Sequence, residues 1–133
     1  QLNAVKALLH TLLIALGASA LISGVLLMVH PDGAALRAPL VLLERTPFRD
    51  FFWPGLILAS VFGLGGVLAS VAIARQLRIG LRFAQVIGAG QVVWILFQVY
   101  WFPILSPLQP ILAGVGLAII LLAEGCRRMD GAR

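Results

Sequence analysis

The stretch ALLHTLLIALGASALISGVLLMV, residues 7–29, is apolar almost throughout and carries no charged side chain; its one histidine is His10. A bilayer core about 30 Å thick needs roughly 20 apolar residues at about 1.5 Å each, so these residues are enough to cross it as a helix. Backbone N–H and C=O groups find no water inside a bilayer and must pair within the segment, which a helix achieves. The stretch therefore predicts a membrane-spanning helix.

Three more stretches of the same kind follow, at residues 54–74, 83–102 and 107–124. Residues 30–53 connect the first two helices, whereas the later connections have only about eight and four residues, which forces consecutive helices to be antiparallel neighbours. We therefore predict a single-domain, all-α membrane protein. It has four transmembrane helices in sequential antiparallel order, with a structured outer loop between the first and second helices.

Composition points to the same class of protein. Hydrophobic residues make up 61% of the chain and charged residues 11%, and the mean hydropathy is +1.04. Soluble domains have about 25% charged residues, so a soluble fold is nearly excluded, and disorder is excluded by the apolar content. The lipid bilayer is the expected partner. The net charge of +5 is explained by basic flanks on membrane helices, and no nucleic-acid partner is expected.

The distribution of cations predicts the orientation. An even number of spans puts both termini and the connection at residues 75–82 on one side, where seven cations lie, against three in residues 30–53. Because positively charged flanks stay inside, both termini are predicted to be cytoplasmic. The seven are Lys6, Arg75, Arg78, Arg82, Arg127, Arg128 and Arg133, and the three are Arg37, Arg45 and Arg49.

The outer loop is too apolar to remain free in water. Leu36 and the run at residues 40–43 are expected to lie on the membrane or across helix ends. Thr46-Pro47 resembles an N-cap followed by proline, so a short helix could begin there and be kinked at Pro54. Ser106-Pro107 fits a similar start for the last helix, and Pro110 leaves a start after Gln109 open.

The search for catalytic chemistry is nearly empty. The predicted spans contain no Asp, Lys or Arg, and His10 and His30 lie about 30 Å apart at about 1.5 Å per residue. Neither a cofactor nor a metal is therefore expected. An outer metal site is the alternative reading of a polar cluster in residues 30–53, but turn and surface polarity is favoured. This outer-loop polar cluster comprises His30, Asp32, Glu44 and Asp50.

Gln91 and Gln98 are the best candidates for a buried polar feature. They are seven residues apart and share one face of the predicted helix at residues 83–102, with Trp94 near that face. An amide in hydrocarbon needs a partner, so the face should point into the bundle or toward another chain. Two readings stay open. One is interhelical hydrogen bonding, which is favoured, and the other is a polar lining for a ligand, a quinone headgroup or a water path.

Small residues at every fourth position mark packing faces, within the chain or between chains. These faces are Ala15/Ser19/Ser23, Gly55/Ala59/Gly63, Gly66/Ser70/Ala74 and Gly114/Ala118.

A cytoplasmic basic rim is predicted beside the second and fourth helices. Topology signalling explains it, and attraction of anionic lipid is the functional alternative. Glu124 and Arg128 form an i,i+4 pair of favourable order. The rim comprises Arg75, Arg78, Arg82, Arg127 and Arg128.

The stretches Pro31-Asp32-Gly33, Thr46-Pro47-Phe48-Arg49-Asp50-Phe51 and Pro54-Gly55-Leu56 resemble those of small four-helix bacterial inner-membrane proteins of unassigned function. That group shows a Pro-x-Gly turn, a Pro-Phe-x-Asp segment and a Pro-Gly-Leu helix start. The resemblance implies a multi-pass protein of the bacterial inner membrane and implies no site residue.

Three function hypotheses follow. The first is a non-catalytic accessory or assembly subunit that packs against itself, as a homo-oligomer, or against a larger membrane complex. The alternative is a small oligomeric transporter or channel lined by Gln91 and Gln98. The second alternative is a membrane enzyme acting on lipid or quinone at the outer loop; an enzyme is the less expected class.

Overall fold

The structure, a computed structural model, describes residues 2–102 and 107–131 of the chain. These residues form helices and connecting turns, with no strand among them. Within them, four helices are long and apolar enough to cross a membrane: Asn3–Val29, Phe52–Ala74, Gly80–Trp101 and Leu108–Met129. The predicted all-α class and the four long apolar helices are confirmed. The elements are α1 (Leu2–Val29), η1 (Ala34–Leu36), η2 (Leu40–Leu43), α2 (Phe52–Ile57), η3 (Leu58–Leu64), α3 (Gly65–Ala74), α4 (Gly80–Trp101) and α5 (Leu108–Gly131).

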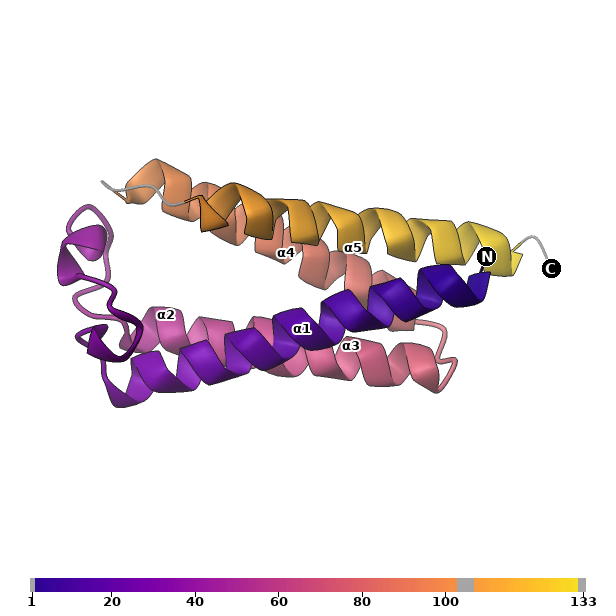
Figure 1. Cartoon of the computed structure of the whole chain (residues 1–133), viewed down its shortest axis with the longest axis horizontal. Helices are drawn as coiled ribbons and strands as arrows, with labels where there is room; N and C mark the ends of the chain where they lie inside the picture. The colour runs from indigo at the N-terminus through magenta and orange to yellow at the C-terminus, as the bar shows by residue number, and fades with distance from the viewer. Residues whose placement is uncertain (1, 103–106, 132–133) are drawn as a thin grey trace.

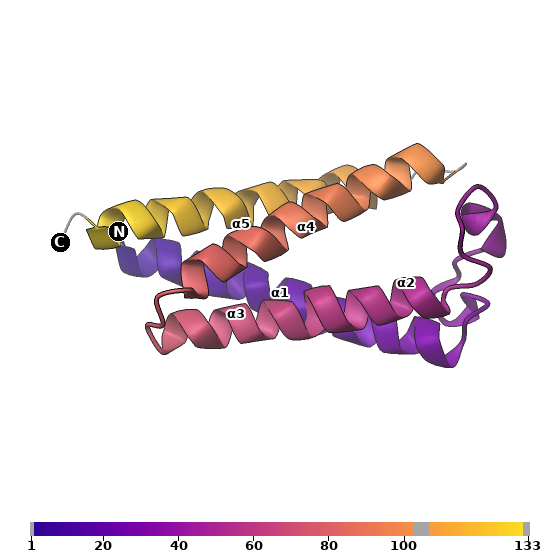
Figure 2. The ribbon, with the colours of Figure 1, turned by 180° about the vertical axis from the view of Figure 1, so that it is seen from behind.

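The helices form two antiparallel hairpins (Figure 1). One hairpin is α1 with the continuous helix α2–η3–α3, in which η3 is a π-helical segment, and the other is α4 with α5. Both ends of the described chain lie at one end of the bundle, here called the termini end, and residues 30–51 cover the opposite loop end. Seen from behind, the hairpins lie close together at the termini end and spread apart toward the loop end (Figure 2).

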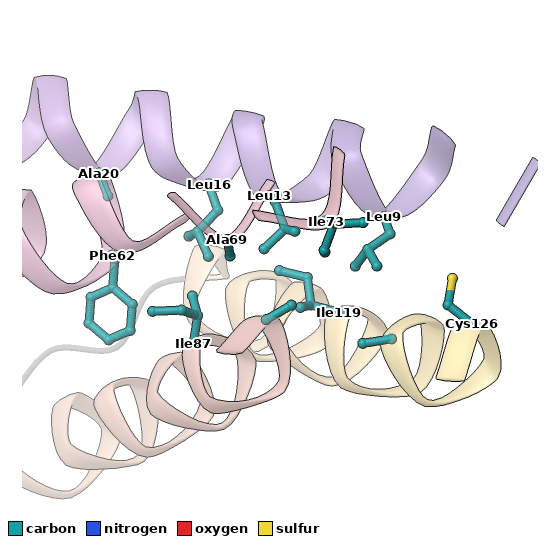
Figure 3. Packing of buried hydrophobic residues seen from close by; sticks show 12 residues of the cluster. Leu9, Leu13, Leu16, Ala20, Phe62, Ala69, Ile73, Ile87, Ile119 and Cys126 are labelled. Carbon is teal, nitrogen blue, oxygen red and sulfur yellow. The ribbon is translucent and has the colours of Figure 1, made fainter. Parts of the chain in front are cut away.

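The main core fills the termini half of the bundle (Figure 3). Leu9, Leu13, Leu16 and Ala20 recur at spacings of three and four along α1, so they share one helix face, and all four are buried. Their partners come from each of the other long helices, which locks both hairpins together at this end. These partners include Phe62 of η3, Ala69 and Ile73 of α3, Ile87 of α4, and Ile119 and Cys126 of α5.

Two glycine pairs set the closest helix approaches. A Cβ built at Gly24 would lie 2.5 Å from the carbonyl oxygen of Gly55, and one at Gly88 would lie 2.7 Å from that of Gly116. Only glycine allows the backbones of α1 and α2, and of α4 and α5, to come this near.

The structure separates the predicted small-residue faces. In the second span the face Gly55/Ala59/Gly63 is buried inside the chain, and so are Gly66 and Ser70 of the next face, whereas its last member, Ala74, is exposed. In contrast, Ala15 and Ser19 are exposed, and α1 uses Gly17 and Gly24 for its close contacts instead. A Cβ at Gly114 would have nothing within 4 Å.

The connection at the loop end is folded, but the predicted helix start at Pro47 is wrong. Thr46 Oγ1 does accept the N–H of Phe48 at 3.2 Å, yet helix begins only at Phe52, whose N–H donates to Asp50 Oδ1 at 3.0 Å. Pro54 is the third helical residue, where no intrahelical N–H bond is lost, so the predicted kink has no cause. Ser106 lies outside the described residues.

The folded connection has its own small core. Leu27, Leu43 and Phe51 are buried together, and the N–H of Phe51 donates to the carbonyl oxygen of Pro31 at 2.8 Å. This contact brings the two ends of residues 30–51 together next to the loop-end termini of α1 and α2.

Helix boundaries differ from the prediction chiefly at the termini end. Helix α1 begins at Leu2 instead of residue 7, α4 at Gly80 instead of residue 83, and α5 continues to Gly131 beyond residue 124. The apolar runs stop earlier than the helices because the last turns carry polar side chains. Glu124 pairs there with Arg127 at 2.6 Å and Arg128 at 3.3 Å, and the predicted Glu124–Arg128 pair is therefore confirmed.

Candidate functional site

A cavity of about 240 Å³ opens between the two hairpins; we call it the inter-hairpin cleft. Its walls come from α1, η3, α4 and α5, and η1 of the loop end contributes Leu36. The lining residues are Leu16, Ser19, Ala20, Ser23, Leu36, Leu58, Gln91, Trp94, Ile95, Gln98 and Leu112. Apolar side chains thus surround a small number of polar groups, the composition common to small-molecule sites.

Gln91 is the most buried polar residue of the cleft, with 2% of its surface exposed. Its position on α4 directs it between the hairpins, where it lines the cleft. Its amide can both donate and accept hydrogen bonds, so it is a group to which a bound molecule can bind.

Gln98 lies on the same face of α4, two turns nearer the loop end. It is half-buried, and its Oε1 accepts a long hydrogen bond of 3.4 Å from Nε2 of Gln109 on α5. Both glutamines line the cleft, but Gln98 also links α4 to α5.

Trp94 lies between the two glutamines in the sequence of α4 and carries an unsatisfied hydrogen-bond donor. Its ring stacks on Phe97 with centroids 5.6 Å apart and an interplanar angle of 8°, and it also contacts Phe62 at 6.4 Å. Its Nε1 is buried and has no hydrogen-bond partner. Because indole Nε1–H is a donor only, this group needs an acceptor.

The π-helical segment η3 forms part of the wall opposite α4. Leu58 of η3 lines the cleft, and Phe62 contacts the ring of Trp94. A π-helical turn inside an α-helix is rare and is found most often at functional sites. Its position here agrees with a functional role for the cleft.

The outer-loop polar cluster is dispersed over turns. His30, Asp32 and Glu44 are exposed and Asp50 is half-buried. Asp32 Oδ1 accepts the N–H of Ala34 at 2.9 Å, and Asp50 Oδ1 accepts that of Phe52, so both carboxylates stabilise turns. No group of three or more His, Cys, Asp or Glu residues that could hold a metal occurs in residues 2–102 and 107–131.

The basic rim divides into two sets. Gln85, which the sequence did not single out, accepts from Arg82 Nη1 at 3.2 Å and donates to Glu124 Oε2 at 3.0 Å. Together with the pairs that Arg127 and Arg128 make with Glu124, these bonds join α4 to α5 at the termini end. Arg75 and Arg78 are exposed on the turn between α3 and α4 and lie outside this network.

Several polar residues of the bundle were not predicted as site residues. Ser19 and Ser23 line the cleft, although their spacing indicated packing, and Gln109 reaches Gln98 from α5. His10 Nδ1 and Ser70 Oγ form a hydrogen bond of 2.6 Å between α1 and α3. Only the polarity of these side chains within apolar helices marks them in the sequence.

No family model, no curated protein and no solved structure matches this chain. Function therefore has to be argued from the geometry of the bundle.

Proposed function

We propose that this chain is a non-catalytic, multi-pass protein of the bacterial inner membrane whose inter-hairpin cleft binds a small amphipathic molecule. Four helices long and apolar enough to cross a membrane support the location. The seven-to-three division of cations supports cytoplasmic termini, which puts the cleft in the outer half of the bilayer.

The observation that carries the proposal is the buried Nε1 of Trp94, which has no hydrogen-bond partner among the described residues, on a cleft that the buried residue Gln91 also lines. Both groups can donate to one ligand oxygen, and the Gln91 amide can also accept. Leu16, Ile95 and Leu112 offer apolar contact to the rest of the ligand. A molecule with carbonyl oxygens on an apolar ring, as in a quinone, has the required chemistry. The volume of about 240 Å³ exceeds the roughly 150 Å³ of an engineered cavity that accepts benzene.

The geometry favours binding over conduction and over catalysis. The termini half of the bundle is filled by Leu9, Leu13 and Ile119, so the cleft ends against packed side chains. Its polar lining consists of hydroxyls, amides and an indole, none of which titrates near neutral pH, which gives little basis for acid–base chemistry.

Trp94 fluorescence tests the proposal directly. In a Trp53→Phe, Trp101→Phe background, Trp94 is the remaining tryptophan, and a short-chain quinone should quench its emission with saturation. The Gln91→Leu variant should bind this quinone about five- to tenfold more weakly, because one hydrogen bond contributes about 1–1.4 kcal/mol.

Matched controls distinguish a site from general quenching. Val93 is exposed on the opposite side of α4, so Val93→Leu should leave the affinity unchanged. A variant that retains only Trp53, an exposed residue, should show quenching that does not saturate. Equal affinities of the Gln91→Leu and Val93→Leu variants would contradict the proposal.

Replacing Gln91 and Gln98 together separates the two readings of this face. Leucine fills a similar volume and brings no polar group, so the double variant should insert and fold. If the glutamines only join helices, quinone binding should persist in the double variant. If they line the site, binding should be lost.

A second candidate is the accessory or assembly role, and Gly114 favours it. Glycine within a helix costs about 1 kcal/mol relative to alanine, yet Gly114 has nothing within 4 Å. A helix of a second copy or of a larger complex packed there would explain this residue. Gly114→Leu should then abolish cross-linking between copies or to the complex, whereas Leu121→Ile, a substitution at an exposed position of the same helix, should not.

A further inference from the structure

We infer that the bundle holds a second binding site, a basic pocket at the termini end that takes the phosphate group of an anionic phospholipid. The inference goes beyond the cleft and rests only on the proposed placement of the four helices in a membrane. The pocket has a volume of about 430 Å³, within the range of roughly 300–1,000 Å³ typical of small-molecule sites.

Three cations from different elements converge on this pocket. Lys6 comes from α1, Arg78 from the turn between α3 and α4, and Arg127 from α5. Among the described side chains that line the pocket, none is acidic. Arg127 gives Nη1 to Glu124 at 2.6 Å, but a guanidinium has five N–H donors in all, so others remain for an anion. Arg78 and the remaining donors of Arg127 therefore present positive charge and hydrogen-bond donors to the pocket from two elements.

The backbone around the pocket also favours an anion. Helix α4 starts beside it, at Gly80, without a side-chain cap and without an acidic residue in its first turn. The N–H groups of a helix start carry partial positive charge and bind phosphate readily. Two of the last carbonyl groups of α3 already accept hydrogen bonds from the chain. Gln76 N–H donates to Ile73 O and Leu77 N–H donates to Ala72 O, both at 3.0 Å.

The position and the apolar wall point to a lipid as the source of the phosphate. Lys6, Leu81 and Arg127 lie within about two turns of the ends of their spans, near the depth at which a lipid headgroup begins. Ile73, Leu77 and Leu81 also line the pocket and offer contact to the glycerol and the first carbons of the chains. Basic pockets between membrane helices are known to bind lipid headgroups in this way.

Two neighbouring arginines allow a matched test. Arg75 and Arg78 are both exposed on the same turn, but only Arg78 lines the pocket. Arg75→Gln and Arg78→Gln therefore remove the same charge from nearly the same place. Simple attraction of anionic lipid to the basic rim predicts equal effects, whereas a pocket predicts that only the change at Arg78 matters.

The experiment is native mass spectrometry of the full chain with equimolar phosphatidylglycerol and phosphatidylcholine. The wild type should retain phosphatidylglycerol preferentially, and Arg78→Gln should retain about fivefold less, the effect of one cation near a headgroup. Arg75→Gln should stay within about twofold of wild type, since an exposed charge outside the pocket contributes little. Arg78→Lys should restore most of the retention, because lysine also holds phosphate as a point charge.

Two results would overturn the inference. Equal losses in Arg75→Gln and Arg78→Gln would leave only a diffuse basic rim. Binding of inorganic phosphate by the wild type, without any preference for phosphatidylglycerol over phosphatidylcholine, would show a site for free phosphate instead of lipid. The topology of the spans is measured separately by cysteine labelling, so a failure here is distinguishable from a failure of the membrane placement.

Discussion

Gln76 ends α3 in the left-handed conformation, with φ at 56°. The bonds from Gln76 N–H to Ile73 O and from Leu77 N–H to Ala72 O form a Schellman motif, in which glycine is the usual residue at this position. A residue with a side chain costs roughly 1–2 kcal/mol in this conformation. Glycine avoids this cost, but part of the gain is lost because glycine has more conformational freedom in the unfolded chain.

Gln76→Gly should therefore raise the free energy of unfolding in detergent by about 0.5–1 kcal/mol. Arg75→Gly is the control, because Arg75 has φ at −86° and gains nothing from glycine, so its stability should fall. Denaturant titration followed by circular dichroism measures both. A loss of stability at Gln76 equal to that at Arg75 would count against the described turn.

Glu124 is the centre of the polar network that joins α4 to α5. It receives bonds from Gln85 and Arg127 and pairs with Arg128. Glu124→Ala should lower the free energy of unfolding, since Gln85, Arg127 and Arg128 all lose their shared charged acceptor. Arg128→Ala should change it by less than about 0.5 kcal/mol, because that side chain is 81% exposed. If Glu124→Ala and Arg128→Ala changed the free energy of unfolding equally in the same titration, the role of Glu124 as the centre of the network would be contradicted.

At the scale of helices, the contact between Gly88 and Gly116 is the closest approach of α4 to α5. Gly88→Ala should force the two helices apart and lower the free energy of unfolding by about 1–3 kcal/mol. Gly114→Ala on α5 has open space and should raise it by up to about 1 kcal/mol in monomeric preparations. Thermal unfolding in detergent checks the pair, and a stable Gly88→Ala variant would contradict the packing.

The four long helices were predictable because each needs an apolar run long enough to cross a bilayer. Such a run is a local property of the sequence and does not depend on which other helices pack against it. Their ends were less predictable. Helix α5 continues past the apolar run because Glu124 finds cationic partners one turn on. The π-helical segment at Leu58–Leu64 has no signature in residue spacing, and it lies where α1 packs against Gly63 of this span.

The cleft was predictable only in part. Period and polarity single out Gln91, Trp94 and Gln98 on one face of α4. That Gln91 and Trp94 line a cleft, while Gln98 also meets Gln109, depends on the hairpins spreading toward the loop end. No local sequence pattern encodes this arrangement. For this reason the spacing of Ser19 and Ser23 predicted packing residues and not residues of a cleft.

At the scale of the whole molecule, the two ends differ in character. The termini end combines the packed core, the polar network and the basic pocket, whereas the loop end combines the cleft with a folded, largely apolar connection. If the loop end faces outward, the segment at residues 36–53 should lie partly in the membrane. Its amides should then exchange slowly in lipid nanodiscs; rapid exchange along the whole segment would contradict this.

The central claim is that the four helices cross the membrane with the loop end outside, since the ligands proposed for the cleft and for the basic pocket both depend on that orientation. Cysteine labelling in intact cells tests it most directly. Cys126 is buried and is first replaced by alanine, and one new cysteine is then placed at Ala34 in η1 or at Ile79 between α3 and α4, both exposed. A membrane-impermeant maleimide should label Ala34→Cys in intact cells and Ile79→Cys only after permeabilisation. Labelling of Ile79→Cys but not Ala34→Cys in intact cells would contradict the orientation, and labelling of both would contradict the spans.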